Sequence, residues 1–220
     1  QRRGPVAIWL HPDGKMGLLE TDGNPRPELR KLLASGVEVV GVDLLYQGEF
    51  LVDGKQLERT RRVQNEREAA AYTLGYNPSL FAQRTHDVLS VIAYLRDRQP
   101  LASGVDLVGL GGAGPWAAAA RSQAGNAVRR AAVDTRGFRF GQVLDIRDPS
   151  LLPGGAKYGD IIGMLAMAAP GDLWLAGEGP DQPPLLRAAY QASGAAERVT
   201  VFSGPPEVIS ASAADWLLLP

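Results

Sequence analysis

Short apolar segments alternate with helical patterns along the chain, and this alternation constrains the fold more than any other feature. Six segments have the apolar character of buried strands: VAIWL (Val6 to Leu10), VEVVGV (Val37 to Val42), VDLVGL (Val105 to Leu110), AAVD (Ala131 to Asp134), DLWLA (Asp172 to Ala176) and VTVF (Val199 to Phe202). Helical patterns lie over Pro27 to Gly36, Pro78 to Arg98, Trp116 to Ser122, Ile161 to Ala168, Pro184 to Ala192 and Val208 to Leu218. Strands that are apolar throughout are buried on both faces. The sequence therefore predicts an α/β fold of three layers, α/β/α, around a mostly parallel, doubly wound sheet of six strands.

The composition is typical of one globular domain. The chain has 220 residues, of which 45% are hydrophobic, so we expect a single domain over residues 1–220. A net charge of −1 gives no general attraction to nucleic acid or to an anionic membrane surface, and no apolar run reaches the roughly 18 residues of a membrane span. Without cysteine and with only two histidines, His11 and His86, a metal site is not expected, and no compartment is indicated. Because the chain begins with Gln1 rather than Met, we expect a processed product or a piece of a longer protein.

The longest connection, residues 43–77, follows the second predicted strand and is expected to form a cap-like insertion. Its charges alternate in sign over a short stretch: Arg59, Arg61, Arg62 and Arg67 against Glu58, Glu66 and Glu68. Interspersed charges of both signs are typical of a segment that faces water. The alternative is a cap that binds anions over the site.

The turn after the third predicted strand belongs to the stretch VDLVGLGGAGPWAAAA, Val105 to Ala120. Gly109, Gly111 and Gly114 have the G-x-G-x-x-G spacing of a dinucleotide-binding turn, and Asp134 stands where an acid would bind the ribose. Two features oppose this interpretation: more than 100 residues precede the turn, and Pro115 removes an N–H that a pyrophosphate would use. The simplest alternative is that the glycines permit a tight passage from strand to helix.

Several segments together resemble the α/β-hydrolase superfamily, in particular its acetyl-xylan-esterase and dienelactone-hydrolase-like branch. IWLHPDGK is similar to the strand and loop that supply an oxyanion hole, and VEVVGVDLLYQGEF to the next strand with its PD-x-x-G-x-G ending. RTHDVLSVIAYLRDR resembles the helix before the nucleophile strand, VDLVGLGGAG the nucleophile elbow VGHSMGG, and DLWLAGEGPD the strand and loop of the triad acid. The resemblance covers nearly the whole chain from Pro5. It implies an α/β-hydrolase-like fold whose leading antiparallel strands are absent and would lie upstream of Gln1.

The same resemblance indicates which catalytic groups are missing. A serine hydrolase needs a hydroxyl on the turn, an imidazole, a carboxylate and backbone N–H groups for the oxyanion. Here Gly111 stands at the serine position, and no histidine follows His86, although the triad histidine belongs after the last strand. Pro12 removes one N–H from the oxyanion loop, which leaves Asp13 and Gly14 as possible donors.

Candidate site residues follow the predicted strands at their carboxyl ends, where parallel sheets bind ligands. The resemblance places the triad acid at Glu178 or Asp181. The other candidates for a binding cleft are His11, Asp13, Gly14, Asp43, Glu49, Gly112 and Asp134. Converging carboxylates could perform acid–base chemistry, but carboxylates in such loops more often bind backbone amides. We expect His11 to fix its loop by a hydrogen bond, His86 to be a structural residue beside core positions, and Ser203 to be an ordinary loop residue.

We therefore hypothesise an esterase-like domain that has lost catalysis and serves as a binding or structural module, without cofactor or metal. Its ligand would be a small molecule or a carbohydrate ester. Its partner would be a catalytic domain or subunit of the same or a longer protein, and neither nucleic acid nor a membrane is expected. One alternative is an active carboxylic or carbohydrate ester hydrolase with an unconventional or externally supplied nucleophile. The other is a dinucleotide-binding protein that uses Gly109, Gly111 and Gly114.

Overall fold

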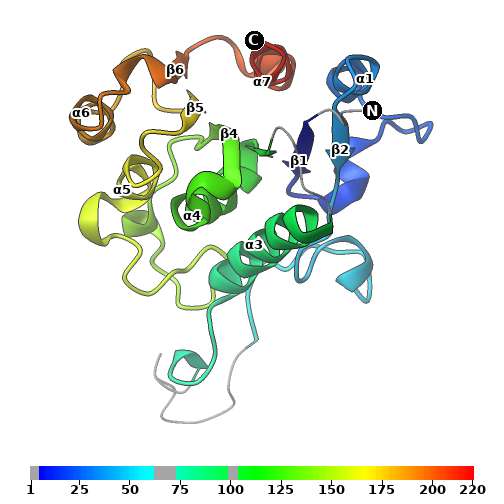
Figure 1. Cartoon of the computed structure of the whole chain (residues 1–220). Helices are drawn as coiled ribbons and strands as arrows, with labels where there is room; N and C mark the ends of the chain where they lie inside the picture. The colour runs from blue at the N-terminus through cyan, green and yellow to red at the C-terminus, as the bar shows by residue number, and fades with distance from the viewer. Residues whose placement is uncertain (1–4, 62–72, 99–103) are drawn as a thin grey trace.

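The computed structural model describes residues 5–61, 73–98 and 104–220, and places a six-stranded sheet between two layers of helices (Figure 1). The strands are β1 (Val6–Leu10), β2 (Glu38–Val40), β3 (Val105–Gly109), β4 (Val128–Asp134), β5 (Asp172–Ala176) and β6 (Val199–Phe202). The helices are α1 (Pro27–Ala34), α3 (Leu80–Arg98), α4 (Gly114–Ala124), α5 (Asp160–Ala166), α6 (Pro184–Ala192) and α7 (Ile209–Leu217). In the described ranges, no helix combines the length and hydropathy that crossing a membrane requires.

The sheet order is β2-β1-β3-β4-β5-β6, and every neighbouring pair of strands is parallel. The predicted three-layer α/β fold with six strands is confirmed, and the sheet of the described residues is entirely rather than mostly parallel. The chain passes from β1 outward to β2 and then returns to β3 on the other side of β1. The direction of winding therefore reverses between β1 and β3, which is where open α/β sheets bind ligands.

The second strand is shorter than the sequence pattern predicts. β2 covers Glu38–Val40 instead of Val37 to Val42, because it is an edge strand that pairs only with β1. The apolar residues beyond it continue into the loop, where Val42 packs against the core without a strand partner.

The fourth strand is longer than predicted. It begins at Val128, ahead of the predicted start at Ala131. The intervening charged residues are accommodated because they have partners on the neighbouring strands: Arg129 forms an ion pair with the buried Asp106 of β3. A strand can therefore include charged residues that a search for apolar runs excludes.

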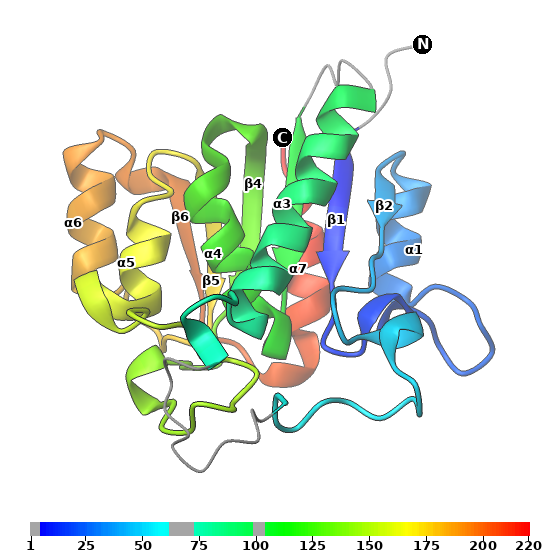
Figure 2. The same ribbon diagram turned by 90° about the horizontal axis from the view of Figure 1, so that it is seen from below.

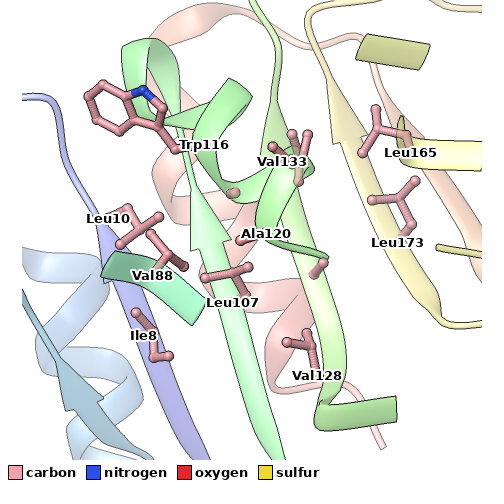
Figure 3. Packing of buried hydrophobic residues seen from close by; sticks show 14 of the residues in the cluster. Ile8, Leu10, Val88, Leu107, Trp116, Ala120, Val128, Val133, Leu165 and Leu173 are labelled. Carbon is pink, nitrogen blue, oxygen red and sulfur yellow. The ribbon is translucent and has the colours of Figure 1, made fainter. Parts of the chain in front are cut away.

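Helices α3, α4, α5 and α6 cover one face of the sheet, and α1 and α7 cover the other (Figure 1). Each face has its own cluster of buried hydrophobic side chains. Figure 3 shows part of the larger cluster, in which Ile8 and Leu107 of the sheet lie close to Val88 of α3. Burial of this apolar surface is the main favourable term for folding, and it fixes the ends of the strands on which the site is built.

The helix that follows β3 lies unusually close to the sheet, and two glycines make this possible. A Cβ atom on Gly114 would lie 1.8 Å from the carbonyl oxygen of Asp134, and one on Gly109 would lie 2.3 Å from the Cβ of Ala117. Neither position can hold a side chain without moving backbone or a buried neighbour. Two of the three spaced glycines therefore serve helix–sheet packing.

The connections that leave the strands at their carboxyl ends gather at one end of the sheet (Figure 2). The predicted insertion, residues 43–77, begins here and includes the short 3-10 helix η2 (Gly48–Phe50). Its described part is attached to the loop after β4, because Thr60 and Arg147 exchange two hydrogen bonds between N–H groups and carbonyl oxygens, of 2.7 and 3.0 Å. The predicted charges at Arg62, Glu66, Arg67 and Glu68 lie outside the described residues.

Candidate functional site

A cleft of about 690 Å³ opens at the carboxyl ends of β1, β3, β4, β5 and β6. Four of the predicted site residues line it: His11, Gly111, Gly112 and Asp134. The remaining polar side chains in its lining are Arg26, Glu28, Arg136, Ser203 and Ser210. Its apolar wall includes Trp9, Leu18, Leu29, Leu110, Phe202 and Ile209. Size and lining are those of a site for a small organic molecule.

The turn after β3 has a left-handed backbone at Gly111, as the predicted nucleophile elbow would have. Gly111 has φ +57°, in the left-handed region that side chains rarely adopt. A Cβ atom at this position would have Arg136 as its nearest neighbour, with Cδ at 3.8 Å and Nη1 at 4.0 Å. A side chain at position 111 would therefore enter the cleft, and Arg136 is the side chain beside it.

Asp134, at the end of β4, is buried beneath the glycine turn. Its carboxylate accepts the backbone N–H of Gly111 at 3.1 Å and that of Arg136 at 3.0 Å. The N–H of Gly111, a donor that a phosphate would need in the dinucleotide interpretation, is thus bound by a carboxylate of the chain itself. The arrangement supports the expectation that acids in these loops bind backbone amides.

Two backbone N–H groups of the loop after β1 donate hydrogen bonds to acceptors in the same loop. The N–H of Asp13 donates to Nδ1 of His11 at 3.1 Å, and that of Gly14 donates to the His11 carbonyl oxygen at 3.0 Å. Both candidate oxyanion donors are therefore engaged within the loop. His11 fixes this loop as expected, and the lone pair of its Nδ1 atom accepts the hydrogen bond from the N–H of Asp13.

Burial lowers the pKa of His11 from its usual value of 6.5. The carboxylate of Asp13 opposes this shift, the guanidinium of Arg26 adds to it, and Glu28 opposes it. A neutral imidazole that already accepts a hydrogen bond is a structural acceptor rather than an available general base.

Asp43, Glu49 and Gly14 form a separate group around Lys15, outside the lining of the cleft. The Asp43 carboxylate accepts the N–H of Lys15 at 2.7 Å and the N–H of Glu49 at 3.3 Å. Although burial alone would raise its pKa, these two N–H groups and the Lys15 ammonium lower the pKa of Asp43. A Cβ on Gly14 would lie 2.1 Å from Oδ1 of Asp43, so this glycine allows the carboxylate to approach the loop.

The two candidates for the triad acid also lie outside the cleft that contains Gly111. The Glu178 carboxylate is bound by both terminal nitrogens of the Arg139 guanidinium and by the hydroxyl of Thr135. Glu178 and Asp181 line a different pocket, on the side of α6. The predicted carboxylates therefore separate into four groups: Asp43 with Glu49, Glu178 with Asp181, Asp13 beside His11, and Asp134, which alone borders the glycine turn.

Three residues differ from what the sequence suggested. His86, expected to be a structural residue, is exposed on α3, at a pocket that Phe81 and Leu89 also line. Arg26 and Arg136 line the cleft but were not among the predicted site residues. Arg136 comes two positions after the end of β4. The signal in the sequence is a cation, rather than an acid, close to the carboxyl end of a strand.

Within the described part of the chain, no three histidine, aspartate or glutamate side chains are grouped closely enough to hold a metal ion. A second cavity, of about 600 Å³, lies between residues 46–61, the beginning of α3 and residues 146–151. It contains none of the predicted site residues.

Comparison with solved structures identifies the fold as α/β-hydrolase-like, at low sequence identity. A Bacteroides fragilis protein provisionally assigned as an acetyl xylan esterase superposes with a TM-score of 0.63 and 14% identity, over 93% of this chain. Est1E from Butyrivibrio proteoclasticus, with ferulic acid bound, superposes with a TM-score of 0.58 and 11% identity, over 99% of this chain and 90% of its own. A Klebsiella pneumoniae protein provisionally assigned as a dienelactone hydrolase gives 0.52 and 11%, over 98% and 86%.

The chain spans 60% of the length of the Bacteroides fragilis protein. No family model and no curated protein sequence matches it. The resemblance that the sequence motifs indicated is thus borne out at the level of the fold.

Proposed function

We propose that this chain is a catalytically degenerate α/β-hydrolase-like domain that binds a small molecule in the cleft around Gly111 without hydrolysing it. The observation that carries the proposal is the turn itself. Gly111 keeps the left-handed backbone of an elbow, with φ +57°, yet presents no atom that could attack a carbonyl carbon.

The surroundings of the turn support the same conclusion. Acyl transfer needs a base for the nucleophile and N–H donors aimed at the developing oxyanion. No histidine follows β6 in the sequence, and Nδ1 of His11, the histidine in the cleft, accepts the Asp13 N–H. The N–H groups of Asp13 and Gly14 are used within their own loop.

The cleft supports a binding role. A volume of about 690 Å³ accommodates a small organic molecule, and the lining combines aromatic walls with polar side chains. Est1E holds ferulic acid, and the ligand of this chain would be of similar size or a carbohydrate ester. A catalytic domain or subunit of the same or a longer protein is the partner we propose for such a module.

Hydrolysis assays test the proposal. We expect no turnover of aryl acetates or acetylated xylan above the uncatalysed rate, and no labelling of a serine by a fluorophosphonate probe. Turnover that disappears in His11→Ala or Glu178→Ala would show an active hydrolase with an unconventional nucleophile. A thermal shift with NAD(H) or NADP(H) tests the dinucleotide alternative, since ligand at 100 times Kd adds about 2.7 kcal/mol to stability.

A further inference from the structure

Two arginines without partners line the same cleft. Among the described residues, the side chains of Arg26 and Arg136 have neither an ion-pair nor a hydrogen-bond partner. Most arginines of the structure are bound to carboxylates or to carbonyl oxygens; Arg139 and Arg129, for example, each bind a carboxylate through two nitrogens. Arg26 is half-buried and Arg136 is exposed at the cleft, so their unpaired guanidinium groups are available to an anionic ligand there.

Arg136 is also placed by a strained backbone. Its φ is +50°, which a non-glycine residue adopts only at a cost, and its N–H is held by the carboxylate of Asp134. The side chain lies next to the open position on Gly111, with Nη1 4.0 Å from where a Cβ would stand. The conformation therefore keeps a cation at the point where a hydrolase would keep its nucleophile.

Building on the proposed function, we propose that the cleft binds a small organic carboxylate, whose carboxyl group is held by Arg136 with Arg26 and whose apolar body lies along Trp9 and Phe202. A guanidinium fork matches a carboxylate with two parallel hydrogen bonds. The apolar side chains of the cleft cover the rest of such a ligand.

The charge of the lining favours a singly charged ligand over a phosphate. Glu28 and Asp134 line the cleft together with the two arginines, so its formal charge is balanced when His11 is neutral. The Gly111 N–H that a phosphate would need is bound to Asp134. A bound carboxylate brings the formal charge of the lining to −1 and a phosphate dianion brings it to −2, and the second negative charge adds repulsion from Asp134.

The test is a calorimetric titration with acetate, hexanoate, benzoate and ferulate, each paired with its methyl ester, and with inorganic phosphate. We expect at least one acid to bind. Its methyl ester should bind about tenfold more weakly or worse, because it cannot form the charge-assisted hydrogen bond, and phosphate should bind about tenfold more weakly or worse, because its extra negative charge is not balanced. Arg136→Gln should weaken that acid about tenfold, Arg136→Lys less, and Glu28→Gln should strengthen it. Arg96→Gln is the matched control, because Arg96 is an exposed, unpaired arginine on α3 outside the cleft.

Arg136→Gly separates recognition from folding. Glycine relieves the positive φ, so this variant should unfold at a higher denaturant concentration while its affinity for the acid falls. Equal affinity for acid and ester, tighter binding of phosphate, or no acid binding would overturn the carboxylate inference and leave the non-catalytic proposal standing. Hydrolysis of a methyl ester would overturn both.

Discussion

The backbone N–H of Gly111 donates a hydrogen bond of 3.1 Å to Oδ2 of Asp134, which joins the turn after β3 to the end of β4. The second carboxylate oxygen accepts the N–H of Arg136 at 3.0 Å. One buried carboxylate thus holds both the glycine turn and the strained backbone of Arg136. These two hydrogen bonds hold the floor of the cleft in one conformation.

Replacing Asp134 should therefore destabilise the fold. Asp134→Ala leaves two N–H groups without their acceptor, and we expect the free energy of unfolding to fall by about 2–3 kcal/mol. Asp134→Asn retains one acceptor oxygen and should lose about half as much. Urea unfolding measures the difference. Asp22→Ala, which removes an exposed carboxylate bound to the N–H of Asn24, is the control and should change stability little. An unaltered midpoint in Asp134→Ala would contradict this account.

Serine at the two glycine positions of the turn should have very different effects. Gly111→Ser introduces a side chain into open space, so only the positive φ opposes it, at about 1–2 kcal/mol. Gly114→Ser places a Cβ 1.8 Å from the Asp134 carbonyl oxygen, which should cost about 4 kcal/mol or more, or prevent folding. Circular dichroism during thermal unfolding separates the two variants.

Gly111→Ser should also remain inactive on aryl acetates. A serine there has a hydroxyl but no imidazole to accept its proton, since Nδ1 of His11 is engaged by the Asp13 N–H. Esterase activity gained by this single substitution would mean that the cleft still holds a working base, and that the loss of catalysis is confined to one residue.

Much of the fold follows from the sequence because it depends on patterns that repeat along each element. Continuous apolar runs gave five of the strands within a few residues, whereas the start of β4 was missed because Arg129 interrupts the apolar run. The ion pair of Arg129 with Asp106 is a contact between neighbouring strands. No local pattern contains such a contact, so the sequence does not predict the first residues of β4.

The site is less predictable than the fold, because whether candidate side chains meet in one cleft depends on their directions as well as on the strand ends that they follow. Asp43, Asp134 and Glu178 all follow strands, yet each binds partners within its own neighbourhood and only Asp134 borders Gly111. The sequence does not mark Arg136, because a hydrolase site is recognised by its acids and histidines. Its importance becomes visible only when its position beside Gly111 and its lack of a partner are known.

Arg84 attaches the beginning of the insertion to helix α3. Its guanidinium donates to the carbonyl oxygens of Leu45 at 2.9 Å and Tyr46 at 3.0 Å, and lies 4.8 Å from the centre of the Trp116 ring. Burial lowers its pKa to about 10, which still leaves it charged at neutral pH. We expect Arg84→Ala to lower the free energy of unfolding by about 2 kcal/mol, because two partly buried carbonyl oxygens lose a charged donor.

Hydrogen exchange measures the local effect of Arg84→Ala, in addition to its effect on the free energy of unfolding. Amides of residues 44–50 should exchange faster in Arg84→Ala, whereas those of β3 should change only with global stability. The control is His86→Ala on the exposed face of the same helix, which should leave both quantities unchanged. Equal effects of the two substitutions would show that the contacts of Arg84 with residues 45, 46 and 116 do not contribute to stability.

The lowered pKa of His11 makes stability depend on pH. The unfolded chain binds a proton near pH 6.5, while burial makes the folded chain bind it only at lower pH. Between these two pKa values the unfolded state holds more protons, so stability rises with pH in that interval and is lost as the pH falls below about 6.5. Protonation of Nδ1 also removes the acceptor of the Asp13 N–H.

His11→Asn should remove this dependence, because an amide oxygen can accept the Asp13 N–H without titrating. We expect the wild-type protein to lose stability relative to His11→Asn when urea unfolding is compared at pH 8 and pH 5, with the carboxylates contributing equally to both proteins. A parallel fall in both would show that the imidazole is not buried in the folded state. The opposite sign would mean that Asp13 and Glu28 outweigh burial and that the folded chain prefers the charged imidazole.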